Sequence, residues 1–209
     1  LEQKLPKGLP EAFLIGEKFI NKNNVALILG DNFFYGQNLT EKLIKCTKLK
    51  NGAKVFLHKV LKPELYGVAK LNKANKIISM KEKPKKYLSD LAITGLYYFD
   101  KKVVEYTKKL KPSKRNELEI ADLLKIYQKK RLLSADLIGR GSAWMDTGSI
   151  DDFYKTSAFV SAVENRQGFK IACLEEIALN YKWITKKEII NSIKFYGKCD
   201  YSNYLQRLI

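Results

Sequence analysis

The stretch Val25-Ala-Leu-Ile-Leu-Gly-Asp-Asn32 decides the fold, because five apolar residues run without interruption into a glycine and a carboxylate. An unbroken apolar run of this length predicts a strand that is buried on both faces. In α/β enzymes, ligand contacts lie just beyond the carboxyl ends of such strands. A second stretch, Ala143-Trp-Met-Asp-Thr-Gly148, repeats the arrangement. We therefore expect Asp31 and Asp146 to converge on one cation, in a magnesium-dependent site that acts on a phosphorylated ligand.

Helical and strand patterns alternate along the rest of the chain, which predicts an α/β fold. The predicted strands cover residues 25–29, 53–60, 68–71, 76–81, 93–99 and 132–138, and the predicted helices cover 9–21, 40–50, 101–109, 117–130 and a segment capped by Ser149. Thr40 is the expected cap of the second helix. Beyond Gly168 the pattern changes to short helices at 174–180, 186–195 and 201–208. We predict an α/β domain over residues 1–168 and a helical appendage over 169–209 that serves assembly or regulation.

The composition is that of an ordinary globular protein, with 45% hydrophobic and 29% charged residues in 209. No apolar stretch approaches the roughly 20 residues that span a bilayer, and no charged and apolar leader opens the chain, so we expect a cytoplasmic protein without a membrane partner. The cysteines, Cys46, Cys173 and Cys199, are too far apart for a disulfide framework or a metal-binding pair. His58 lies within a strand pattern, where a structural role is favoured over that of a general base.

The formal charge of +17 invites a nucleic-acid partner. The lysines are scattered along helices and turns, however, and no recognition motif accompanies them. A lysine-rich surface is therefore the favoured interpretation, and its field would still attract small anionic ligands. No GxGxxG or GxxxxGK[ST] phosphate loop occurs, and the chain opens at a turn over residues 4–8.

Seven motifs, taken in their order along the chain, resemble the sugar-1-phosphate nucleotidylyltransferases. Within that family they are most similar to the short glucose-1-phosphate thymidylyltransferases of deoxysugar pathways. The motifs are Gly8-Leu-Pro-Glu-Ala-Phe13, Leu27-Ile-Leu-Gly-Asp-Asn-Phe-Phe-Tyr-Gly36, Pro63-Glu-Leu-Tyr-Gly-Val68, Glu82-Lys-Pro84, Ala92-Ile-Thr-Gly-Leu-Tyr97, Arg115-Asn-Glu-Leu-Glu-Ile-Ala-Asp122 and Gly139-Arg-Gly-Ser-Ala-Trp-Met-Asp-Thr-Gly148.

The resemblance implies a three-layer α/β/α nucleotide-diphospho-sugar transferase fold with a mixed, Rossmann-like sheet. It also implies a magnesium-dependent reaction in which dTTP and glucose 1-phosphate form dTDP-glucose and pyrophosphate. The family assembles as tetramers and carries a second, regulatory nucleotide site near its helical tail. The family's N-terminal glycine-rich segment, which cradles the triphosphate, has no counterpart here, so we expect an incomplete nucleotide half of the site.

The resemblance also assigns the site residues. It makes Asp31 and Asp146 the magnesium ligands and, with Lys83, the catalytic residues. It places Gln3 and Gly8 where the family reads the thymine base. The sugar-phosphate pocket would be formed by Asn32, Gly67, Glu82, Lys83 and Ile93, the last standing where the family more often has valine.

Three alternatives remain open at this point. One is a non-catalytic remnant that binds sugar phosphate or pairs with a full-length subunit. Another is a metal-dependent glycosyltransferase, although its usual Asp-x-Asp motif is absent around Asp31. A third is UTP in place of dTTP, since much of the base pocket belongs to the segment without a counterpart.

Overall fold

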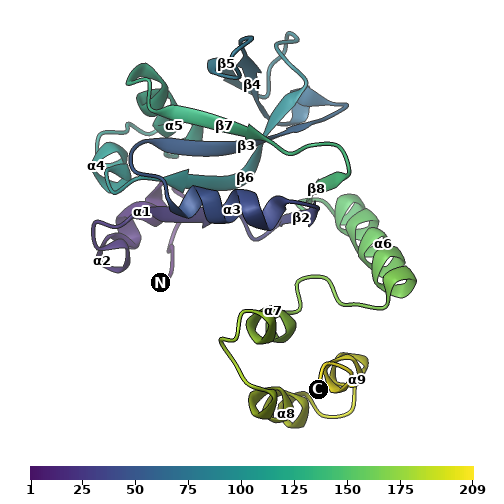
Figure 1. The fold of residues 1–209 in the computed structure, drawn as a ribbon. Coiled ribbons are helices and arrows are strands. Elements are labelled where there is room, and N and C mark those ends of the chain that lie inside the picture. The colour runs from purple at the N-terminus through teal and green to yellow at the C-terminus, as the bar shows by residue number, and fades with distance from the viewer. The chain divides into compact units, whose positions relative to one another are not determined.

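The computed structural model describes all 209 residues and divides them into two compact units. Unit 1 comprises Leu1–Asp146 and unit 2 comprises Thr147–Ile209. The path of the chain through each unit can be followed by colour in Figure 1. All three cysteines are free thiols, and no helix is both long and apolar enough to cross a membrane.

The main sheet of unit 1 has six strands and is mixed, as expected. The strands are β1 (Val25–Ile28), β3 (Ala53–Lys59), β4 (Gly67–Leu71), β5 (Ile77–Glu82), β6 (Leu91–Phe99) and β7 (Leu133–Leu137). Their order is β5-β4-β6-β3-β7, and β1 also pairs with β6. Only β3 and β7 run parallel; the other pairs are antiparallel.

Strand β6 pairs along one edge with two different strands, first with β4 and then with β1. Ala92 of β6 pairs with Val68 of β4, whereas the segment from Leu96 to Phe99 pairs with β1. Between these two pairings lies Gly95, where β4 and β1 diverge from β6. Such a divergence opens a crevice beside β6, between β4 and β1, and crevices at points where strand order changes are where α/β proteins bind ligands.

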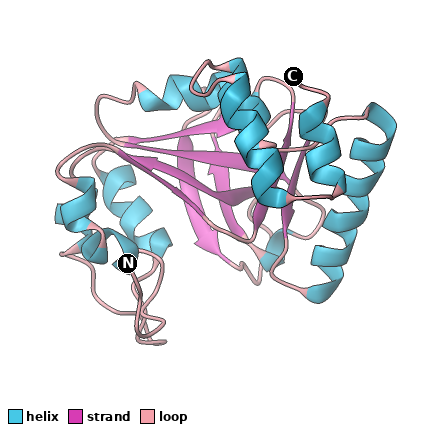
Figure 2. Ribbon diagram, turned by 90° about the horizontal axis from the view of Figure 1, so that it is seen from below, coloured by secondary structure: helices cyan, strands magenta, loops and turns pink.

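Helices cover both faces of the sheet, which makes unit 1 a three-layer structure (Figures 1 and 2). Four of them pack on one face: α1 (Glu11–Ile15), α2 (Glu17–Ile20), α4 (Val103–Thr107) and α5 (Ile120–Lys129). Side chains alternate across a strand, so Val55 and Leu57 of β3 face these helices while Phe56 faces the other layer. That layer holds α3 (Leu39–Thr47), whose Cys46 packs against Phe56.

A separate two-stranded ribbon holds both aspartate motifs. Its strands are β2 (Asn32–Gly36) and β8 (Ser142–Asp146), which pair antiparallel. The sequence patterns predicted a turn after Asp31 rather than a strand. A single 3₁₀ turn, η1 (Pro63–Leu65), precedes β4.

Unit 2 consists of four helices: α6 (Ile150–Gln167), α7 (Leu174–Asn180), α8 (Lys186–Tyr196) and α9 (Asp200–Gln206). The predicted cap is confirmed, because the Ser149 hydroxyl accepts a hydrogen bond of 3.1 Å from the Asp152 amide. Helix α6 ends at Gly168, which adopts the left-handed conformation that glycine favours. The domain boundary expected at 168–169 differs from the division between the compact units, which falls after Asp146 and places α6 in unit 2. The role of the residues beyond 168 stays a prediction.

Three local predictions were wrong. The helix expected over 9–21 is two short helices that meet at Gly16. The strand from Val25 is half-exposed, with Ile28 58% exposed, because it pairs on one side only. Thr40 lies inside α3, and Asn38 precedes the helix instead.

Candidate active site

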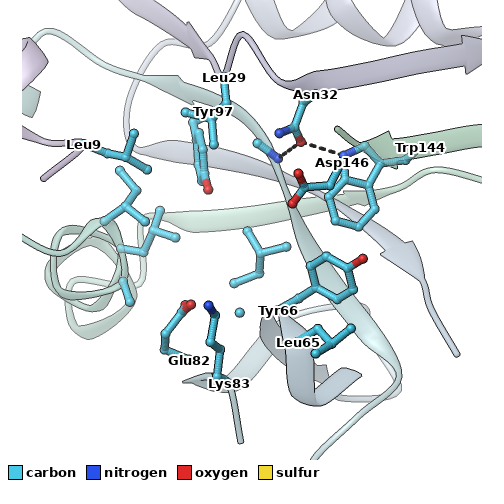
Figure 3. A pocket seen from close by; sticks show the side chains of 16 residues that line it. Leu9, Leu29, Asn32, Leu65, Tyr66, Glu82, Lys83, Tyr97, Trp144 and Asp146 are labelled. Atoms are coloured by element: carbon cyan, nitrogen blue, oxygen red, sulfur yellow. Dashed lines mark hydrogen bonds between the residues drawn. The ribbon is translucent and has the colours of Figure 1, made fainter. Parts of the chain in front are cut away.

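A cavity of about 220 Å³ lies in unit 1 beside the point where β4 and β1 diverge from β6 (Figure 3). Six of the residues assigned by resemblance line it, namely Asn32, Gly67, Glu82, Lys83, Ile93 and Asp146. Other lining residues, including Leu9, Gly95 and Tyr97, lie within motifs that showed the resemblance but had no assigned role. The cavity therefore brings together residues from segments that are far apart in the chain.

The acidic residue Glu82 and the basic residue Lys83 of the cavity lie at the end of β5. Gly67 is the strand partner of Glu82, and a Cβ atom at Gly67 would lie 2.7 Å from Glu82 Oε2. Glycine therefore leaves the room that this carboxylate occupies. Lys83 follows with φ of 38°, and its N–H donates to the Tyr66 carbonyl at 3.0 Å. A lysine held in the left-handed region is strained, and such strain is concentrated at functional sites.

Aromatic rings form one wall of the cavity. The ring centroids of Tyr66 and Trp144 are 5.2 Å apart, and those of His58 and Trp144 are 6.1 Å apart. His58 does not line the cavity itself. The hydroxyl of Tyr97 points into the cavity (Figure 3), and burial, followed by the Glu82 carboxylate, raises the pKa of Tyr97. This phenol is therefore protonated at neutral pH and can donate to a bound ligand.

The ribbon places Asp31 and Asp146 close together. Asn32 and Asp146 are Cα partners in the β2–β8 pair, and Asp31 directly precedes Asn32. Asp146 lines the cavity, whereas Asp31 does not; the Asp31 carboxylate accepts a hydrogen bond from Asn32 Nδ2 at 2.8 Å. The predicted proximity of the two residues thus follows from a strand pairing that the patterns did not reveal.

The donor set suits magnesium. No group of three or more histidine, cysteine, aspartate or glutamate side chains is positioned to hold a metal ion. Magnesium is commonly held by one or two carboxylates that are completed by water and substrate phosphates. Asp31 and Asp146 fit that pattern, in which substrate phosphates complete the coordination of the ion.

Gln3 and Gly8 lie next to each other but outside the cavity lining. Gln3 Nε2 donates to the Gly8 carbonyl at 3.2 Å and to Glu11 Oε2 at 2.5 Å. Gly8 has φ of 95°, and a Cβ there would meet the Leu118 carbonyl oxygen at 2.0 Å. The segment is thereby attached beside α5, and the next residue, Leu9, reaches the cavity. Base reading by Gln3 and Gly8 stays a prediction.

A second cavity, of about 320 Å³, shares Glu82 and Lys83 with the first and extends to Arg115 and Lys125. Arg115 Nη2 donates to both oxygens of Glu119, at 3.0 and 2.9 Å. Arg115 opens one of the motifs quoted above, yet it received no role from the sequence. Its guanidinium is paired with the Glu119 and Glu117 carboxylates, so Arg115 adds no net positive charge beside Lys83.

Comparisons with known proteins agree with this geometry. Residues 1–163 match the model of the nucleotidyl transferase family. The chain is 46% identical over 207 residues to a glucose-1-phosphate thymidylyltransferase of Neisseria gonorrhoeae, covering 99% of this chain and 72% of that protein. It is 37% identical over 207 residues to the enzyme of the same name from Mycobacterium tuberculosis, with the same coverage of both chains.

Solved structures give the same result for the fold. One, described as a glucose-1-phosphate thymidylyltransferase of Bacillus anthracis in complex with sucrose, superposes with a TM-score of 0.67 at 37% identity. The match covers 76% of this chain and 62% of that one. A UDP-glucose pyrophosphorylase complexed with UDP-glucose reaches the same TM-score at 27% identity, over 76% of this chain and 64% of that one. The chain belongs to the nucleotidyl transferase family, among the glucose-1-phosphate thymidylyltransferases.

Proposed function

We propose that the protein transfers a thymidylyl group from dTTP to glucose 1-phosphate, forming dTDP-glucose and pyrophosphate. The observation that carries the proposal is the arrangement of charge in the cavity. Glu82 and Lys83 stand across the cavity from Asn32 and Asp146 (Figure 3). The names of the relatives support dTTP and glucose 1-phosphate as the substrates.

The sugar phosphate binds through groups of both signs. The Glu82 carboxylate accepts hydrogen bonds from sugar hydroxyls, and the Tyr97 phenol donates one. The Lys83 ammonium pairs with the phosphate as a point charge. Gly67 and Ile93 shape the pocket, and the ring of Trp144 covers an apolar face of the sugar.

The reaction is a displacement at phosphorus. A phosphate oxygen of glucose 1-phosphate forms a bond to the α-phosphorus of dTTP, the bond from that phosphorus to the bridging oxygen breaks, and pyrophosphate leaves with the electron pair. Since the nucleophile is the substrate's own phosphate, no catalytic serine or histidine is needed. The protein contributes positioning and charge neutralisation, as in other phosphoryl transfers.

Asp31 and Asp146 would hold a magnesium ion, which would neutralise charge on the triphosphate and orient it. Gln3 and Gly8 read the thymine base in the same proposal. A homotetramer and a regulatory nucleotide site near the helices of unit 2 also belong to the proposal, and they rest on the family resemblance alone. The proposal also includes the cytoplasmic location that was expected from the sequence.

Pyrophosphate release from dTTP and glucose 1-phosphate tests the activity directly. We expect release by the purified protein in the presence of Mg²⁺, with dTTP preferred over UTP. Release no greater than that of the Asp146→Asn variant would contradict the proposal. A preference for UTP would support nucleotidyl transfer and would replace dTTP by UTP as the proposed nucleotide substrate.

Calorimetric binding of glucose 1-phosphate tests the pocket separately. Removing the Lys83 ammonium deletes a charge-assisted contact, so Lys83→Ala should weaken binding about 10-fold. The matched control is Lys81→Ala, two residues earlier on β5, which is exposed and lines neither cavity. Equal losses in the two variants would show a general effect of charge rather than a binding site.

A further inference from the structure

The carboxamide of Asn32 is held in one orientation by two groups that can only donate. Its Oδ1 atom accepts from the Gly95 N–H at 2.9 Å and from the Trp144 indole N–H at 2.7 Å (Figure 3). A backbone N–H and an indole N–H have no acceptor capacity, so the oxygen must face them. The amide nitrogen must therefore turn the other way, and there it donates to Asp31 Oδ1 at 2.8 Å.

Gly95 is the residue that makes this arrangement possible. It lies where β4 and β1 diverge, so the Asn32 side chain supplies the partner that a strand would otherwise give to the Gly95 N–H. The Gly95 carbonyl accepts from the Leu29 N–H at 2.9 Å on the same edge. A Cβ at Gly95 would lie 2.6 Å from Asn32 Cγ and 2.6 Å from its Oδ1. Any larger residue would push the carboxamide away from β6.

These contacts bear on both aspartates. Asn32 bonds to the carboxylate of Asp31 and is the strand partner of Asp146, and Trp144 lies two residues before Asp146 on β8. We infer that Asn32 and Trp144 are positioning residues, which fix the two magnesium-binding carboxylates to the central strand β6. This inference rests on the proposed function for the metal, and it gives Asn32 a role other than that of a substrate ligand. Groups that orient metal ligands in this way commonly contribute 10- to 100-fold to metal affinity.

The hydrogen bond itself is tested without any ligand. The chain has two tryptophans, so Trp183→Phe leaves Trp144 as the single indole. In that background we expect the Trp144 indole N–H to exchange slowly with solvent in nitrogen-15 NMR spectra. Adding Asn32→Ala should accelerate the exchange about 10-fold or more, since a bond near 1.4 kcal/mol corresponds to that factor. Unchanged exchange would overturn the inference.

The consequence for the metal is tested with Mn²⁺ alone, followed by the electron paramagnetic resonance signal of the free ion. Trp144→Phe keeps an aromatic ring and removes the N–H, and it should weaken Mn²⁺ binding about 10-fold. Gly95→Ala, on another strand, should act in the same direction by displacing Asn32. The control, Trp183→Phe, makes the same chemical change at a 72% exposed residue of unit 2 and should leave Mn²⁺ binding unchanged.

Two further results would overturn the inference. One is unaltered Mn²⁺ affinity in Trp144→Phe and Gly95→Ala together with lowered thermal stability, which would make the contacts structural only. The other is an Asn32→Ala variant that loses metal-free glucose 1-phosphate binding and keeps its Mn²⁺ affinity, which would make Asn32 a substrate ligand. Failure of the proposed function is recognised separately, because the wild-type protein would then bind Mn²⁺ without binding glucose 1-phosphate or releasing pyrophosphate.

Discussion

The two units differ in where they use their polar side chains. Unit 1 buries an extensive apolar core on both faces of its sheet, and its polar groups gather in the cavity beside β6. Unit 2 has a small core, made of Cys173, Ile189, Tyr204 and Leu205. Hydrogen bonds from tyrosines to glutamates surround that core: Tyr201 and Tyr196 donate to Glu175 at 2.5 and 2.9 Å, and Tyr204 donates to Glu176 at 2.5 Å.

This difference separates chemistry from stability. A site on a rigid sheet holds its functional side chains in a fixed geometry, since the apolar core beneath the site provides the stability of the unit. A small unit buries too little apolar surface for that division, so single polar bonds matter more to its stability. We therefore expect variants in unit 1 to lose activity without unfolding, and variants in unit 2 to lose stability without a direct effect on chemistry.

The largest effect is expected from Asp146→Asn. It removes one of two carboxylates proposed to hold the cation, so the turnover number should fall by about 100-fold or more, while the melting temperature stays close to that of the wild type. The measurement is pyrophosphate release beside a thermal scan. Asp151→Asn makes the same change at an exposed residue of unit 2 and should keep full activity. A comparable loss in both variants would break the separation between the units.

Asp100→Ala tests the exception within unit 1, a buried polar residue away from the cavity. Asp100 is 1% exposed, and its carboxylate accepts from the Gly52 N–H at 2.6 Å, the Lys102 N–H at 3.0 Å and the Tyr127 hydroxyl at 2.9 Å. Its removal leaves these donors unsatisfied and should lower the free energy of unfolding by about 3 kcal/mol. Urea denaturation measures the change.

The control for that experiment is Tyr127→Phe, which removes one of the three donors and should cost about 1 kcal/mol. Equal losses in Asp100→Ala and Tyr127→Phe would mean that the two backbone bonds contribute nothing. The Tyr127 hydroxyl would then account for the whole contribution of Asp100 to the stability of unit 1.

Most of the main sheet and most of the helices of unit 1 could be predicted from the sequence, because their apolar periodicity is local. The β2–β8 ribbon could not, since it depends on a pairing between Asn32–Gly36 and Ser142–Asp146. Motif resemblance pointed to Glu82, Lys83 and Asp146, and all three line the cavity; the roles that it gave them stay predictions. It missed Gly95, because a glycine within an apolar strand shows no chemistry until its neighbour Asn32 is placed.

The half-exposure of β1 also lay beyond sequence reasoning. The run from Val25 to Leu29 is apolar throughout, and such a run predicts burial on both faces. Burial depends on pairing partners, however, and β1 pairs with β6 only. Composition alone does not report how many neighbours a strand has.

The stability of unit 2 should fall at acidic pH. Burial raises the pKa of Glu175, but hydrogen bonds from Tyr201 and Tyr196 lower it more, so the pKa lies below its ordinary value. A carboxyl group with a lowered pKa stabilises the fold above its unfolded pKa, and this stabilisation is lost as the pH falls through the folded pKa. We expect the unfolding midpoint of unit 2 to fall as the pH drops below about 4.

Fluorescence of Trp183, which stacks on Tyr181 in unit 2, reports this transition in a Trp144→Phe background. Glu175→Gln should lower stability at neutral pH by about 1.5 kcal/mol, the typical value of a bond to a charged group, and should flatten the acid dependence. Glu41→Gln, at an exposed residue of α3 in unit 1, should leave the Trp183 transition unchanged. An acid dependence that persists in Glu175→Gln would assign it to another carboxylate.

The smallest effect, and the sharpest test of the comparison, is expected from Tyr204→Phe. Tyr204 is 4% exposed, and burial, followed by its bond to Glu176, raises the pKa of its hydroxyl to about 12. Phenylalanine keeps the ring in the core and removes only the donor, so unit 2 should lose about 1 kcal/mol, measured by urea denaturation with Trp183 fluorescence. Tyr154→Phe, at a 74% exposed residue of α6, should change nothing. If the two variants are equally stable, apolar contacts hold unit 2 as they hold unit 1, and the units differ in size rather than in kind.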